Sequence, residues 1–288
     1  LRLPPDEAHQ RSVQAAHLLP QFYPQAGLEL SAVPGPLTAS GRVHDLVVYF
    51  PARSTVFVPE EGRWTSRFEV GLVAVDGTGK ETYRTARDIR ILLPSDVSPG
   101  GDLGINLFAR VPLPARPQTI TAVLSDRRGG ILGAMRLSYN PEKDAGGTVT
   151  GLSIYSLDQR SLWIDIDAPG ERGEDREEEI HAYESGPAFR TRFAPGEPVA
   201  CGFKLPGGGP ADGRSLELVI LKGEEIVRSK SLGRQEGGAT GTVKVTLPVQ
   251  GLANGHYILL VREKSDSGHR EHGRLAFRIG PDDRADLR

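Results

Sequence analysis

Short segments of alternating apolar and polar residues fill most of this chain, and they constrain its fold more than any other feature. In one of them Phe68, Val70 and Leu72 alternate with Glu69 and Gly71. Because successive side chains on a strand point to opposite faces of a sheet, this alternation predicts strands with one buried face. Turns rich in Gly, Pro and Asp separate the segments from residue 28 onward, without an intervening helical pattern. The sequence therefore favours antiparallel β-sandwiches over a parallel α/β fold.

The first predicted sandwich runs from residue 28 to residue 140. Its clearest turn is Asp76-Gly77-Thr78-Gly79, because glycine supplies the positive φ that tight hairpins require. Apolar runs at Arg90–Leu93 and Ile120–Leu124 predict further strands. Residues 1–27 form a lead-in with one short helix, expected from Asp6, as the N-cap, to Leu19, before Pro20.

A second sandwich is predicted from residue 148 to residue 281. The segment Asn140–Gly147 contains almost no apolar residue and is expected to be the linker between the two. Alternation recurs at Leu216–Ile220 and at Val243–Leu247. Tyr257–Val261 is continuously apolar, as expected of a central strand that is buried on both faces.

The segment Leu252-Ala253-Asn254-Gly255-His256-Tyr257 has the L-x-x-G-x-Y form of a tyrosine corner. In Greek-key sandwiches such a Tyr begins a late strand, and its hydroxyl bonds to nearby upstream backbone. The alternative is an ordinary strand with a partly buried Tyr. The turn Phe193–Glu197, which looks like the entry to an early strand, favours the corner. We therefore expect two tandem immunoglobulin- or fibronectin-III-like sandwiches, with Leu252, Gly255 and Tyr257 as structural residues.

Composition excludes several classes of protein. The 35 basic and 37 acidic residues nearly cancel, which argues against nucleic acid as a partner. One cysteine, Cys201, cannot form an intrachain disulfide, and no apolar run approaches the 18 residues of a membrane span. The chain begins at Leu1 without an apolar leader, which indicates a processed or excised fragment.

Several segments resemble the region that follows the A domain in bacterial von Willebrand factor A-related proteins. In the second half these are GPAFRTRFAPGEPVACGF (186–203) and GLANGHYILLVREKSDSGHREHGRLAFRIG (251–280). In the first half they are FEVGLVAVDGTGKE (68–81) and TITAVLSDRRGGILGAMRLSYNP (119–141), and RSVQAAHLLP (11–20) resembles the stretch after the A domain. The resemblance implies an extracytoplasmic, non-catalytic module beside an upstream A domain, and it implies no specific ligand.

The chain departs from that family in two ways. Thr119 stands where the first sandwich usually has its strand-opening Tyr. The metal-ion-dependent adhesion string D-x-S-x-S of the A domain is also missing, since Ser95-Asp96-Val97-Ser98 has the wrong spacing. Any metal function of that kind would therefore lie outside this chain.

Two groups of residues are weighed as metal ligands. Asp165 and Asp167, together with the acids of Glu171–Glu184, could bind Ca²⁺, or that segment could be a solvated, mobile loop, which we favour. His256, His269 and His272 could bind zinc if the last two strands pair, but we expect solvated hairpin histidines, because residues 269 and 272 should face opposite ways. We expect no bound metal ion and no other cofactor. The sequence does not predict whether the acidic segment Glu171–Glu184 binds Ca²⁺.

Catalytic and ligand-binding motifs are weak. Gly77-Thr78-Gly79-Lys80-Glu81 lacks the leading glycine and the Ser or Thr of a P-loop. Cys201 lies in a probable buried strand, where thiols act as small apolar groups, and no nucleophile elbow is present. A paired-carboxylate hydrolase stays open, but no pair stands out.

The function expected is a non-catalytic module with a structural or protein-interaction role, periplasmic or secreted, accessory to an A-like domain. The alternative is a carbohydrate-binding module of a larger secreted enzyme, which would need Trp64, Trp163 and Tyr155 exposed and coplanar. The sequence does not predict the ligand or the oligomeric state.

Overall fold

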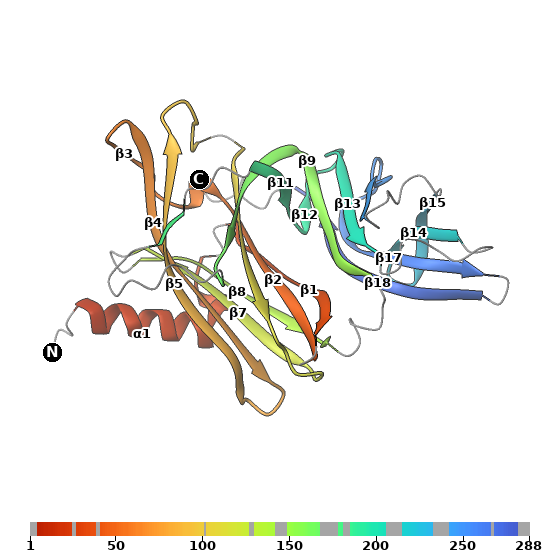
Figure 1. Cartoon of the computed structure of the whole chain (residues 1–288), viewed down its shortest axis with the longest axis horizontal. Helices are drawn as coiled ribbons and strands as arrows, with labels where there is room; N and C mark the ends of the chain where they lie inside the picture. Colours follow the sequence, from red (N-terminus) through yellow and green to blue (C-terminus); the bar gives the residue numbers. More distant parts are fainter. Residues whose placement is uncertain are drawn as a thin grey trace. The chain divides into compact units, whose positions relative to one another are not determined.

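The computed structural model describes residues 5–24, 27–38, 41–100, 102–126, 130–141, 149–167, 178–180, 185–205, 215–232, 242–265 and 268–281. Most of these residues are in β-strands, and the α-helix is α1 (Pro5–Leu18) near the start of the chain (Figure 1). The predicted all-β sandwich class with a short N-terminal helix is confirmed. No helix within these described ranges is long and apolar enough to cross a membrane.

The strands form three sheets. The seven-stranded sheet has the order β1 (Glu29–Thr38), β2 (Gly41–Pro51), β6 (Gly104–Val111), β9 (Thr150–Asp165), β13 (Val199–Lys204) and β16 (Thr242–Thr246), with β11 (Ser185–Phe189) also on β9. The six-stranded sheet has the order β10 (Glu178–Ile180), β5 (Glu81–Pro94), β4 (Arg63–Asp76), β7 (Gln118–Ser125) and β8 (Ile131–Tyr139), with β3 (Val58–Glu60) on β4. The five-stranded sheet has the order β12 (Arg192–Phe193), β18 (Gly268–Ile279), β17 (Gly255–Ser265), β14 (Ser215–Lys222) and β15 (Glu225–Leu232).

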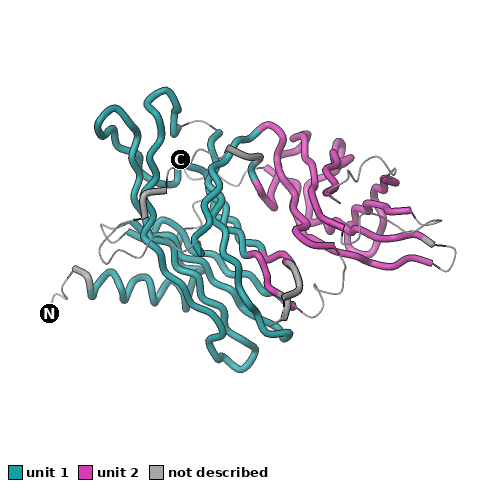
Figure 2. Tube along the Cα trace, in the orientation of Figure 1, with its two compact units in different colours: residues 1–31, 46–139, 159–188 teal, residues 32–45, 140–158, 189–288 magenta. Residues whose placement is uncertain are grey.

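Contacts divide the chain into two compact units that interleave along the sequence (Figure 2). Unit 1 comprises residues 1–31, 46–139 and 159–188, and unit 2 comprises residues 32–45, 140–158 and 189–288. Strand β9 belongs to both: its residues 150–156 pair antiparallel with β13 in unit 2, and its residues 161–165 pair parallel with β6 in unit 1. The predicted boundaries at 28–140 and 148–281 stay a prediction, and most of the predicted linker lies outside the described residues.

Unit 1 is a sandwich whose core is apolar, as the alternation predicts. Phe68, Val70 and Leu72 on β4 are buried on the inner face. Phe68 contacts Phe50 on β2 edge to face, with ring centroids 5.4 Å apart, which joins the two sheets. Aromatic pairs of this geometry add to the free energy gained by burial.

Helix α1 covers the outer face of the six-stranded sheet. Its apolar residues Ala8, Ala15, Ala16 and Leu19 suggest a weak stripe, of which Ala16 is fully buried against β7 and β8, whereas Ala8 and Leu19 are exposed. The helix begins at Pro5, so Asp6 lies inside the first turn and is not the N-cap. The chain then makes a 3₁₀ turn, η1 (Pro20–Phe22), because Pro20 cannot continue the α-helical hydrogen bonding.

Unit 2 packs its part of the seven-stranded sheet against the five-stranded sheet. The backbone of Gly273 on β18 lies so close to Leu152 on β9 that an added Cβ would be 3.4 Å from its side chain. Leu259 and Val261 on β17 are fully buried, and this strand lies between β14 and β18. The expectation of a central strand at 257–261 is confirmed.

The acidic segment 171–184 is only partly described. Residues 168–177 and 181–184 lie outside the described ranges, so the calcium question stays open there. Glu178–Ile180 nevertheless forms β10, which pairs parallel with Ile89–Ile91 of β5. The expectation of a solvated loop is therefore wrong for these three residues, because backbone pairing with an edge strand does not require apolar side chains.

Candidate functional site

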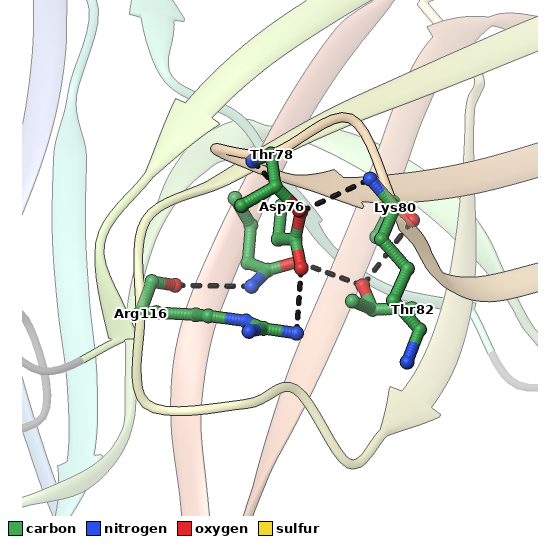
Figure 3. A network of polar contacts seen from close by, with 7 residues as sticks. Asp76, Thr78, Lys80, Thr82 and Arg116 are labelled. Atoms are coloured by element: carbon green, nitrogen blue, oxygen red, sulfur yellow. Dashed lines mark hydrogen bonds and ion pairs between the residues drawn. The ribbon is translucent and has the colours of Figure 1, made fainter.

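The hairpin between β4 and β5 contains the Gly77–Lys80 segment that superficially resembles a P-loop (Figure 3). Its centre is Asp76, which is almost fully buried. Asp76 Oδ1 accepts hydrogen bonds from the Thr78 hydroxyl at 2.6 Å, the Thr78 amide at 2.9 Å and the Lys80 amide at 3.0 Å. An internal carboxylate therefore occupies the amide groups that a phosphate would need, and the segment joins two strands instead of a strand and a helix.

Residues outside the turn complete this network. Arg116 reaches Asp76 Oδ2 at 2.5 Å, and Thr82 donates to Gln118 at 2.7 Å (Figure 3). The hydrogen bond from the Thr78 hydroxyl lowers the pKa of Asp76, with further lowering by the two amides and Arg116. Asp76 thus stays ionised as the structural centre of the hairpin.

Asp165 and Asp167, the two candidate calcium ligands, make hydrogen bonds within unit 1. Asp165 is exposed at the end of β9, and its Oδ1 accepts the amide of Asp167 at 3.0 Å. The Asp167 carboxylate accepts hydrogen bonds from the Tyr83 hydroxyl, at 3.1 Å, and from the amide of Arg110. Burial raises the pKa of Tyr83, and Asp167 raises it further, so Tyr83 keeps its proton and donates. Asp167 therefore ties β5, β6 and the end of β9 together within unit 1.

The three candidate histidines separate on the β17–β18 hairpin. His256 and His269 are exposed, as expected, but His272 is buried. Its Nε2 lies 3.0 Å from Glu263 Oε2, which is also buried. The expectation of a solvated His272 is wrong because the register contains a bulge.

Val261 pairs with Gly273, while Arg262 pairs with Glu271, so His272 is the extra residue of β18. Such a bulge changes which way the following side chains point. In the described part of the chain, no three His, Cys, Asp or Glu side chains gather as a metal ion would require.

Tyr257 lies at the predicted tyrosine corner. Its ring is buried and stacks on Phe277 at 5.6 Å, and its hydroxyl donates to the carbonyl oxygen of Ala253 at 2.6 Å. Leu252 is half-buried, and Gly255 has a φ of 158°, which side chains rarely adopt. The energetic contribution of these residues stays a prediction.

The three aromatic residues of the carbohydrate alternative do not share one face. Trp64 is half-buried on β4 in the six-stranded sheet, whereas Trp163 and Tyr155 lie on β9 in the seven-stranded sheet. Trp163 is 37% exposed and stacks on Phe108 with ring centroids 4.6 Å apart. Trp163, which is stacked and partly exposed, is therefore the one of the three residues that still fits a carbohydrate-binding surface.

Cys201, on β13, is fully buried, as expected.

The sequence analysis missed the most exposed apolar group of the described residues. Leu18 is 65% exposed, Leu19 is 48% exposed and Phe22 is 76% exposed, all where α1 ends and η1 begins. We call these three residues the helix-end patch. Adjacent exposed apolar side chains are typical of surfaces that contact another molecule. The signal in the sequence was the group of apolar residues on either side of Pro20, which the pattern of the helix alone did not identify as exposed.

No protein-family model matches this chain, and no curated protein matches it. Among solved structures it is similar to the soluble domain of PmoD from Methylocystis sp., at 15% identity over 46% of this chain and 90% of that one, with a TM-score of 0.25. It is also similar to the BSP domain of a biofilm-associated protein, at 9% identity over 88% of this chain and 51% of that one, with a TM-score of 0.24. Dimeric latent PorU from Porphyromonas gingivalis matches at 10% identity, over 89% of this chain and 24% of that one, with a TM-score of 0.26. This chain therefore spans about half of the BSP chain and a quarter of PorU, and none of these low scores bears on its function.

Proposed function

We propose that this chain is a non-catalytic, extracytoplasmic module of immunoglobulin-like sandwiches that contacts a neighbouring von Willebrand factor A-like domain. The observation that carries the proposal is the helix-end patch: Leu18, Leu19 and Phe22 are large, apolar and exposed at the end of α1 and in η1. The patch lies within and just after the segment RSVQAAHLLP, which resembles the stretch behind the A domain in the related proteins. A domain preceding that stretch would be close enough to cover it.

The candidate chemical groups support a structural role. Asp76 anchors a hairpin, Asp167 joins three strands, and His272 pairs with Glu263 inside unit 2. Each of these groups has a partner within its own unit, so each contributes to the fold. A substrate would have to displace those partners before the groups could act on it.

Binding to the A-like domain encoded in the same reading frame tests the proposal. We expect that domain, expressed separately, to bind the present chain in a calorimetric titration. Leu18→Ser/Phe22→Ser should weaken binding at least about tenfold, because the complex would no longer bury these two large apolar side chains. The matched control is Val56→Ser/Val58→Ser, which alters an exposed apolar pair elsewhere in unit 1 and should leave binding unchanged. A complete reading frame without an A-like domain, or equal binding by both variants, would overturn the proposal.

The carbohydrate alternative rests on Trp163 alone, since Trp64 lies in the other sheet. A glycan array distinguishes it from the leading proposal. Binding that disappears in Trp163→Ala and persists in Leu18→Ser/Phe22→Ser would favour the carbohydrate function.

A further inference from the structure

Helix α1 contacts the six-stranded sheet through a face that carries two histidines. His9 and His17 are eight residues apart, just over two helical turns, so they lie on the same side of the helix. Val13 and Ala16, between them, pack against Val123 of β7 and Ala134 of β8. An imidazole therefore lies at each end of an otherwise apolar contact.

His17 lies directly over Gly71 of β4. A Cβ added to Gly71 would be 2.8 Å from His17 Nε2, so only glycine leaves room for the ring at this position. The other ring nitrogen, Nδ1, is buried and has no hydrogen-bond partner among the residues that the structure describes. A neutral imidazole tolerates this site, but a protonated one would have a buried N–H donor and a positive charge without compensation.

The charged groups around this contact do not favour a second positive charge. Arg84 of β5 faces His17, and Glu81, which also interacts with it, is held by Arg84 in an ion pair of 2.5 Å. Arg136 of β8 donates to the carbonyl oxygen of Leu18 at 2.7 Å and so adds a cation at the same end of the helix. At the other end of the helix, Glu69 of β4 lies 3.9 Å from His9 Nε2.

We propose that the α1–sheet contact is an acid-sensitive latch, in which protonation of His17 releases the helix from the outer face of the six-stranded sheet. The released segment would uncover Gly71, Val123 and Ala134. A free helix of 14 residues is marginal in water, so α1 would also lose helical structure. The latch does not depend on the A-like partner proposed above.

The pH window follows from the environment of His17. Burial, with Arg84, lowers the pKa of His17 from 6.5 to about 4 in the docked helix. Because the released helix then binds the proton more tightly, docking is fully favoured above pH 6.5 and weakens as the pH falls toward 4. With these two pKa values the release equilibrium at pH 5 should be about 30-fold larger than at pH 8.

Hydrogen exchange of the intact chain measures this equilibrium directly. Protection factors of the α1 amides, corrected for the intrinsic exchange rate at each pH, should fall about 30-fold between pH 8 and pH 5. Amides of β17 in unit 2 serve as the internal reference. In His17→Leu the fall should shrink to less than about threefold, because the titrating group is absent while the apolar volume is kept.

His9→Gln is the matched control on the same helix face, and it should keep most of the pH response. Gly71→Ala should lower α1 protection already at pH 8, because its Cβ takes the place of the ring. If α1 of His17→Leu does not pack on the sheet at either pH, an NMR titration of His17 in the unmodified chain tests the proposal instead. A His17 pKa between 6 and 7, or an equal fall in protection in His17→Leu, would overturn the latch.

Discussion

Two histidines, the half-buried His17 of unit 1 and the buried His272 of unit 2, have opposite surroundings. His17 of unit 1 lies over a glycine with its Nδ1 unpaired in the described structure and with Arg84 nearby. His272 of unit 2 lies 3.0 Å from the buried carboxylate of Glu263. Burial alone excludes the charged form of an imidazole, whereas a carboxylate at hydrogen-bond distance makes that form acceptable.

The difference shows that the exposed fraction of a histidine does not predict how its contacts contribute to the stability of the fold. The unit 1 contact should be strongest when its histidine is neutral, since burial and Arg84 together outweigh the attraction of Glu81 for a charge on it. The unit 2 contact should be lost when either partner is removed, since the remaining group would be buried without its partner. The following experiments test this comparison, from the largest expected effect to the smallest.

Removing His272 should produce the largest effect. His272→Leu leaves the Glu263 carboxylate buried without the imidazole, and we expect unit 2 to lose about 3 kcal/mol of its free energy of unfolding. Hydrogen exchange of β14 and β17 at increasing urea measures the loss. The double variant Glu263→Leu/His272→Leu should recover part of it, since no charge is then left buried. His269→Leu, at an exposed position of the same strand, is the control. If it lowers the free energy of unfolding as much as His272→Leu does, the contact between His272 and Glu263 contributes little to the stability of unit 2.

Acid should destabilise unit 1 through His17. The pKa of His17 is lowered from 6.5 to about 4, so the unfolded chain binds more protons between these values and stability falls with pH. We expect unit 1 to lose about 2 kcal/mol from pH 7 to pH 5 relative to His17→Leu. Trp64 and Trp163 both belong to unit 1, so tryptophan fluorescence in urea follows this transition. Identical pH profiles for the two proteins would contradict the contrast with His272.

The hydroxyl of Tyr257 should contribute less than either histidine. Tyr257→Phe leaves the Ala253 carbonyl without its donor and should cost unit 2 about 1–2 kcal/mol in calorimetric unfolding. The fluorescence transition of unit 1 should not move. Tyr155→Phe, a half-buried Tyr in the same unit, is the comparison. Gly255→Ala should also destabilise unit 2, because side chains rarely adopt the φ of 158° that Gly255 has.

Removal of divalent metal should have the smallest effect. We predict that excess chelator leaves the melting temperature unchanged within error, because Asp167 already accepts hydrogen bonds from Tyr83 and Arg110. A large fall that Ca²⁺ reverses would instead show a calcium site involving the acids near residues 171–184.

The sequence predicted the parts of the fold that depend on local pattern. Alternation at Phe68–Leu72 predicted a strand with one buried face, and the apolar run at Tyr257–Val261 predicted a central strand. The Asp76–Gly79 turn was likewise predicted from glycine and aspartate alone. These features follow from the period of a strand and from the φ that a turn requires, so they can be seen in a single segment.

The polar contacts could not be predicted in the same way. A one-residue bulge at His272 turned a side chain that a regular register would have left in water. The buried face of α1 contains His17 because Gly71, 54 positions away, leaves room for the ring. Nothing near either histidine in the sequence indicates these partners.

The sequence by itself determined the β class, the positions of several strands and the short helix before them. The tertiary structure decided that β9 would serve two units, that β10 would extend a sheet, and which histidines would be buried. The physical reason is one of range. Strand alternation and turn geometry depend on neighbours a few residues apart, whereas register, bulges and packing partners depend on contacts between segments far apart in the chain.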